Sequence, residues 1–269
     1  MDVTLELLLL KVAIAPLFIA LVSLVALRHG HRAAGWLVAL PINTGTILFI
    51  LTLTDGLSFA ASAALGALLG IVSLAAFAIA YGRCATRLAW PICLGIAAGA
   101  FVLSTFAMSE VPGLVELDAA AAVVAVTAAL LLLPSSPESG APTSMPRWEI
   151  PVRMLTAALL VLVITTGADT LGARLSGLLS PIPVFTITLV IFTHSRHGPA
   201  PIFVFLGGLQ LGLYSFAAFC AVVAILLEPF GLLVAVLCGL AAFLAVYGVV
   251  RSVLGHRAKL RNGRAEGSG

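Results

Sequence analysis

Uncharged, strongly apolar stretches recur along the whole chain, and the charged residues gather in the short segments between them. Most of these stretches have around 20 residues, enough for a helix to cross the roughly 30 Å hydrocarbon core of a bilayer. This pattern predicts an all-α integral membrane protein with nine transmembrane helices. The expected spans are residues 5–27, 36–54, 57–81, 88–107, 113–133, 151–169, 177–193, 201–227 and 230–250.

The composition agrees with a membrane protein and gives no sign of catalysis. Of the 269 residues, 61% are hydrophobic and 9% are charged, against about 25% charged residues in soluble domains. The four cysteines have neither disulfide nor metal-ligand spacing. No Walker, His-Glu-x-x-His, Gly-x-Ser-x-Gly or Cys-x-x-Cys motif is present. We therefore expect no enzyme activity, no catalytic residue, no cofactor and no metal.

The basic residues predict an orientation in the bilayer. Lys and Arg concentrate on the cytoplasmic side of membrane proteins, so the basic tail from Arg251 to Arg264 is expected to be cytoplasmic. With nine spans the N-terminus then lies outside, and among the 14 Lys and Arg residues only Lys11 and Arg174 fall elsewhere. The formal net charge of +3 thus reflects membrane orientation, and we expect the lipid bilayer, and no nucleic acid, as a partner.

A stretch of the chain occurs twice. Residues 30–79 and 172–221 align without a gap at a shift of 142, and 15 of the 50 positions are identical, several of them Gly, Pro or Thr. Five spans separate the starts of the two copies, so the copies are expected to be inverted in the membrane. The predicted organisation is repeat 1 at 1–111 (spans 1–4), a linker helix and cytoplasmic loop at 112–150, inverted repeat 2 at 151–250 (spans 6–9) and a basic cytoplasmic tail at 251–269.

Prolines are expected to interrupt spans 2 and 7. A proline inside a helix removes a backbone hydrogen bond and clashes with the preceding turn. Thr44 follows Trp36 by eight residues, about 12 Å at the helical rise, which places the first break near the middle of the bilayer. Broken helices that meet at this depth are typical of secondary transporters, whereas an ordinary kink only shapes packing. The substrate-binding residues expected at the breaks are Pro41, Asn43, Thr44, Gly45, Pro183, Phe185 and Thr186.

Two cations, Lys11 and Arg153, are also related by the shift of 142. Ionisable groups within spans usually face the bundle interior or a water-filled cavity. Lys11 in particular would suit an anionic substrate or a lipid phosphate. The alternative is that each long side chain carries its charge to the nearer membrane interface.

The second repeat holds polar residues that the first lacks. Gln210 replaces Leu68, and Tyr214 lies one helical turn further along span 8. Both are candidates for the substrate pathway, although a transmembrane Gln can equally connect neighbouring helices. Gly66-x-x-x-Gly70 and Gly208-x-x-x-Gly212 are expected to let spans 3 and 8 cross closely near a pseudo-two-fold axis.

The five histidines are all cytoplasmic in the expected topology: His29, His31, His194, His197 and His256. Their spacing could seed a metal site, but no Cys, Asp or Glu accompanies them. Contact with lipid headgroups is the better interpretation.

Two segments carry a resemblance to known bacterial proteins. The segment from Gly177 to Pro183 resembles the proline-containing segment of the small GlpM-type membrane proteins. The chain as a whole resembles duplicated, uncharacterised multi-pass membrane proteins with a Lys in the first span and a Gly-Trp-Leu-Val-x-Leu-Pro entry to the second, here Gly35 to Pro41. The resemblance implies a helical protein of the bacterial cytoplasmic (inner) membrane and implies no substrate.

These observations favour an alternating-access secondary transporter for a small anionic or amphipathic solute, with its site at the paired proline breaks. One alternative is a lipid flippase or scramblase whose spans form a groove for a headgroup. The other is a non-transporting membrane scaffold. A transporter should hold a polar cavity between spans 2 and 7, and a flippase should open that cavity sideways to the bilayer.

Overall fold

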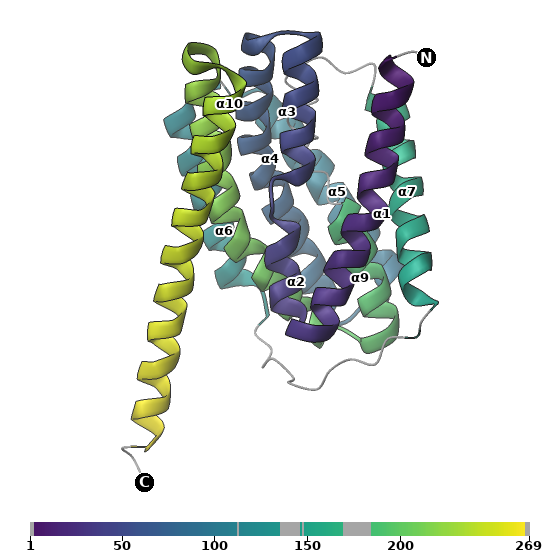
Figure 1. Cartoon of the computed structure of the whole chain (residues 1–269). Coiled ribbons are helices and arrows are strands. Elements are labelled where there is room, and N and C mark those ends of the chain that lie inside the picture. Colours follow the sequence, from purple (N-terminus) through teal and green to yellow (C-terminus); the bar gives the residue numbers. More distant parts are fainter. Residues whose placement is uncertain (1–2, 112, 135–145, 147, 169–183, 267–269) are drawn as a thin grey trace.

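The described part of the chain is a bundle of helices (Figure 1). A computed structural model describes residues 3–111, 113–134, 146, 148–168 and 184–266, with backbone alone at 3–15, 43, 161–168 and 254–266. These residues form nine helices. The helices are α1 (Val3–His29), α2 (His31–Val38), α3 (Ile42–Thr54), α4 (Leu57–Cys84), α5 (Trp90–Ser109), α6 (Val115–Leu132), α7 (Glu149–Ala168), α9 (Val184–His197) and α10 (Ala200–Glu266).

These nine helices are not the nine predicted spans. The second expected span is divided into α2 and α3, as the prediction of a break there requires. The eighth and ninth expected spans lie together in α10, whose backbone leaves the helical conformation at Gly231, with φ 78° and ψ 172°. Figure 1 shows the chain reversing direction at this glycine. Residues 177–183 of the expected seventh span lie outside the described residues.

Several helices are long and apolar enough to cross a bilayer. Among the described residues, four stretches qualify by length and composition: Leu57–Cys84, Trp90–Ser109, Val115–Leu132 and Ala200–Val253. Large apolar side chains also lie on the outer surface, including Leu131 at 80% exposure and Leu233 at 74%. A surface this apolar is costly in water and natural in lipid. The protein is therefore a multi-pass membrane protein.

Charge separates the two ends of the bundle. Arg28, at the end of α1, and Arg32, at the start of α2, lie at the lower end in Figure 1. A hydrogen bond of 2.8 Å from Arg83 Nε to the Leu132 carbonyl brings the ends of α4 and α6 together. We call this lower end the basic end. Asp55, by contrast, follows α3 at the upper end, where the chain turns into α4.

The centre of the bundle is formed by α4, α2 and the first half of α10. α4 is buried along most of its length, and both α2 and α4 pack extensively against α10. Glycines on both sides allow α2 to approach α10 closely. A Cβ at Gly35 would collide with the Phe205 carbonyl oxygen and lie 2.6 Å from the Leu209 nitrogen.

The glycine pair of span 8 has a different partner from the expected one. A Cβ at Gly208 would collide with the Arg32 carbonyl oxygen, and one at Gly212 would lie 2.5 Å from the Ala39 Cβ. Both glycines therefore face α2, a short helix that packs closely against α10. Gly208 and Gly212 thus serve close packing against α2, while α4, the helix of span 3, also packs extensively against α10.

We predict that Gly35→Ala destabilises the protein, since the added methyl group meets backbone atoms that cannot rotate away. Overpacking of this kind costs about 1–3 kcal/mol. Gly45→Ala is the matched control, because its Cβ would have nothing within 4 Å and the substitution favours helix. Thermal unfolding in detergent measures both. An unchanged melting temperature for Gly35→Ala would contradict the close approach of α2 to α10.

Candidate functional site

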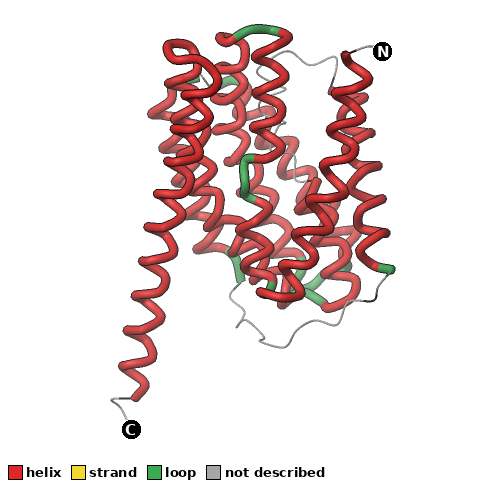
Figure 2. Tube along the Cα trace, viewed as in Figure 1, coloured by secondary structure: helices red, strands yellow, loops and turns green. Residues whose placement is uncertain are grey.

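The break between α2 and α3 lies inside the bundle. Pro41 has no backbone N–H, and the helix ends three residues before it. The Ile42 N–H donates to the Leu40 carbonyl at 2.8 Å, and regular helical bonding resumes with Gly45 N–H to the Pro41 carbonyl at 2.8 Å. Figure 2 shows this loop halfway along the bundle. The predicted interruption at Pro41 is thus confirmed, while its counterpart at Pro183 lies outside the described residues.

The described residues among those expected to bind substrate at the two breaks lie on or directly before two helices, α3 and α9. Thr44, on α3, and Thr186, on α9, are 4% and 1% exposed. α3 packs against α4 and α10, whereas α9 packs against α1, α5, α7 and α10. The ring of Phe185 lies 4.7 Å from that of Phe18 on α1, and Gly45 is half-buried. The side chains of Asn43 and Lys11 lie outside the described residues.

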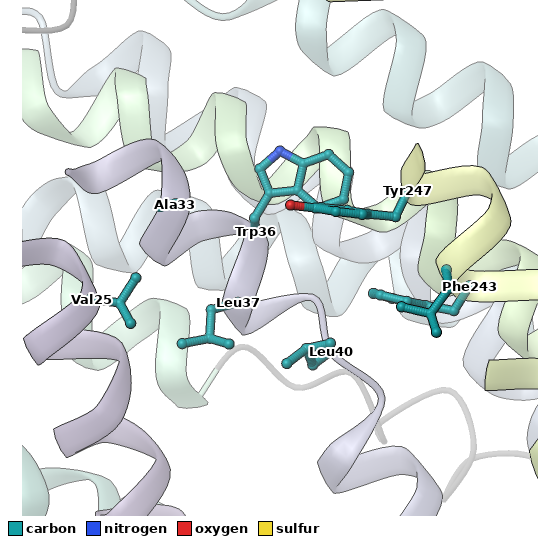
Figure 3. A pocket seen from close by; sticks show the side chains of 8 residues that line it. Val25, Ala33, Trp36, Leu37, Leu40, Phe243 and Tyr247 are labelled. Carbon is teal, nitrogen blue, oxygen red and sulfur yellow. The ribbon is translucent and has the colours of Figure 1, made fainter. Parts of the chain in front are cut away.

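A cavity adjoins the break, but it is apolar and differs in position from the predicted one. It holds about 230 Å³ and lies between α1, α2 and the second half of α10 (Figure 3). The rings of Trp36 and Tyr247 meet edge to face across it, with centroids 4.4 Å apart. We call it the α1–α2–α10 groove. It is lined by Val25, Ala33, Trp36, Leu37, Leu40, Phe243, Leu244 and Tyr247.

Tyr214 and Gln210, the two polar residues predicted to line the pathway on span 8, differ from each other in their surroundings. The Tyr214 hydroxyl hydrogen-bonds Thr127 Oγ1 on α6 at 2.7 Å, so Tyr214 connects α10 to α6. Gln210 is fully buried, and both polar atoms of its amide lack a hydrogen-bond partner among the described residues. A buried amide without partners is costly, which makes Gln210 the candidate best placed for a polar ligand.

A buried ionic cluster was not predicted from the sequence. Arg153, on α7, is 1% exposed and Glu149 is fully buried. Two guanidinium nitrogens of Arg153 donate to Glu149 Oε1, at 3.1 and 2.5 Å. A third lies 3.5 Å from Ser23 Oγ on α1, and the guanidinium carbon lies 5.4 Å from the centre of the Phe192 ring on α9. Arg153 therefore faces the bundle interior, and the alternative that it extends to the membrane interface is wrong.

The spacing of Glu149 and Arg153 in the sequence is compatible with an ion pair on one helix. Glu149 precedes Arg153 by four residues, and residues four apart share one face of a helix. The sequence does not show, however, that α1 and α9 cover that face. Burial of the pair depends on those two helices.

Two histidines lie beside the ionic cluster at the basic end. His31 Nε2, at the start of α2, and His197 Nδ1, at the end of α9, are buried without a hydrogen-bond partner among the described residues. Burial, together with the positive charges of His197 and Arg153, lowers the pKa of His31 from 6.5 to about 4. The described residues include no group of three His, Cys, Asp or Glu side chains that could hold a metal ion.

We predict that Glu149→Gln strongly destabilises the protein, because it leaves the Arg153 charge buried without a counter-charge. Breaking a buried ion pair on one side costs about 3–5 kcal/mol, whereas replacing both partners with apolar residues is often neutral. The control is therefore the double variant Glu149→Leu/Arg153→Met. Thermal unfolding should show a much larger loss for the single variant than for the double one. Equal losses would contradict the account of the pair.

We predict that the protein loses stability as the pH falls from 6.5 towards 4. The pKa of His31 is depressed on folding, so the unfolded chain binds this proton more readily than the folded one. The stabilising contribution is complete above pH 6.5 and disappears as the pH approaches 4. Melting temperatures measured across this range, with His31→Asn alongside, test the assignment. If the variant keeps the full pH dependence of the parent, His31 is not its source.

No protein-family model matches the chain, and no curated protein or solved structure compared with it gives a match. The resemblance to GlpM-type proteins accordingly stays a prediction from short motifs.

Proposed function

We propose that the protein is an alternating-access transporter for an amphipathic anion, built from two inverted halves at 1–111 and 151–250. The observation that carries this proposal is the break at residues 39–41, inside the bundle. Irregular backbone at membrane depth is tolerated where protein buries it or where it lines a cavity. Broken helices of this kind form the substrate sites of many secondary transporters.

The directions of the helices support the inverted arrangement. α1 runs towards the basic end, whereas α7, its counterpart at the shift of 142, starts there (Figure 1). The same relation holds for α4 and the first half of α10. Two halves of opposite direction can exchange conformations, and this exchange opens the site to one side at a time.

In this mechanism the ionic cluster closes the basic end of the bundle. Arg153 of the second half, paired with Glu149, contacts Ser23 of the first half, and the cluster is almost wholly buried. We infer that these contacts close the basic end in the conformation described. A transport cycle then separates α1 from α7 there, which exposes a guanidinium able to bind an anion.

Lipid translocation is the second candidate, and one observation favours it. The α1–α2–α10 groove is apolar, and its wall residue Leu244 is 64% exposed, so the groove opens to the side that lipid would occupy. A flippase or scramblase needs such a lateral opening, which a transporter of water-soluble molecules does not.

Cysteine labelling tests both candidates. Thr44→Cys and Thr186→Cys are made in a variant without the four native cysteines, in vesicles of defined orientation. Alternating access predicts that a membrane-impermeant maleimide labels both positions from each side, since the site opens in turn to each. Ser73→Cys is the control, because Ser73 is fully buried against Thr105 of α5 and should stay unlabelled.

The outcomes separate the two functions. Labelling only by a lipid-soluble maleimide would favour the lipid pathway. Protection of both positions from both reagents, on both sides of the membrane, would contradict transport through the break.

A further inference from the structure

The α1–α2–α10 groove is the starting point, because its shape and surroundings are those of a lipid site. Its walls come from two helices that do not pack extensively on each other, α1 and the second half of α10, and its floor is α2. Figure 3 shows Leu37 and Leu40 of α2 between the two walls. Leu21 and Leu24 of α1, on the same membrane surface, are 47% and 43% exposed.

The size of the groove suits part of an acyl chain. Its volume of about 230 Å³ is below the range of about 300–1,000 Å³ for pockets that hold compact drug-sized ligands. The distance along α2 from Ala33 to its end at Val38 is about 7.5 Å at the helical rise, half the depth of one leaflet. A narrow apolar groove of this length fits a hydrocarbon chain better than a compact solute.

Arginines lie where the groove reaches the basic end. Each helix of the groove has one within about a turn of a lining residue: Arg28 three residues after Val25 on α1, Arg32 four residues before Trp36 on α2, and Arg251 four residues after Tyr247 on α10. Residues three or four apart lie on the same side of a helix. All three arginine side chains are exposed.

Acidic residues are absent from these helices near the groove. The sequence has no Asp or Glu at residues 7–54 or at residues 229–265. Arg28 and Arg251 therefore have no acidic residue within several helical turns of them along their own helices. Clustered arginines at the membrane surface attract anionic lipid headgroups, at roughly 1 kcal/mol for each basic residue.

We infer that the α1–α2–α10 groove binds an anionic phospholipid, with an acyl chain in the groove beside the paired rings of Trp36 and Tyr247 and the phosphate at Arg28 and Arg251. Arg–phosphate pairs are strong charge-assisted hydrogen bonds, and burial of the chain in the groove adds hydrophobic free energy. The inference depends on the groove and its charges, so it holds whether or not the protein transports a solute.

Quenching of Trp36 fluorescence tests the inference directly. The chain has three tryptophans, so Trp90→Phe/Trp148→Phe leaves Trp36 as the only reporter. The variant is reconstituted in phosphatidylcholine vesicles with a small fraction of acyl-brominated phosphatidylglycerol or, separately, acyl-brominated phosphatidylcholine. We expect the anionic lipid to quench Trp36 at a lower mole fraction than the neutral lipid does. A reporter with Trp90 alone, from Trp36→Phe/Trp148→Phe, should show little preference.

Charge variants identify the headgroup contacts. Arg28→Gln and Arg251→Gln should each weaken the preference for the anionic lipid, by about fivefold for one basic residue at the membrane surface. Arg87→Gln is the matched control, because Arg87 is exposed in the connection between α4 and α5 and does not line the groove. Ala33→Phe should reduce the quenching by both lipids, since the added ring occupies the groove.

Two results would overturn the inference. One is equal quenching of Trp36 by the anionic and the neutral lipid. The other is a preference that Arg28→Gln and Arg251→Gln change no more than Arg87→Gln does. Both results can be obtained without Ala33→Phe, so poor folding of that variant does not remove the test.

Discussion

The close contact between α2 and α10 is the constraint on which much of the bundle depends. A helix interrupted at residues 39–41 has backbone groups that lipid cannot satisfy, so the break requires surrounding protein. Gly35, Gly208 and Gly212 bring the two backbones so close that even a methyl group would collide. This approach places the break inside the bundle, and it positions Trp36 against Tyr247 of the second half of α10. The groove therefore follows from the same packing as the break.

The glycines allow close packing, whereas the ionic cluster depends on it. Arg153 and Glu149 are removed from water only where α1 and α9 cover them. A buried pair of this kind contributes little net stability and costs much when one partner is lost. It therefore favours one arrangement of α1, α7 and α9 over others more than it stabilises the bundle as a whole. The low pKa of His31 reflects the same burial.

Local sequence signals predicted the local features of this protein. The break at Pro41 follows from the missing N–H of proline, and the reversal of α10 near Gly231 follows from the gap expected after residue 227. Contacts between distant segments were not predictable in the same way. The partner of Gly208 proved to be α2, and the cavity formed beside the second half of α10, because both depend on how a short half-helix packs. The site expected at Pro183, Asn43 and Lys11 falls on side chains outside the described residues.

The reversal at Gly231 has a mechanical consequence. After this residue the helix continues to Glu266, past the lower end of the bundle in Figure 1, a length of about 50 Å at the helical rise. Near the turn it packs on the first half of α10, where a Cβ at Gly239 would lie 2.8 Å from Val223. The far part continues this helix without a further break, so a tilt of the helix by about 10° would displace its tip by roughly 9 Å. Small movements of this helix within the membrane would therefore produce larger displacements of its tip, beyond the basic end.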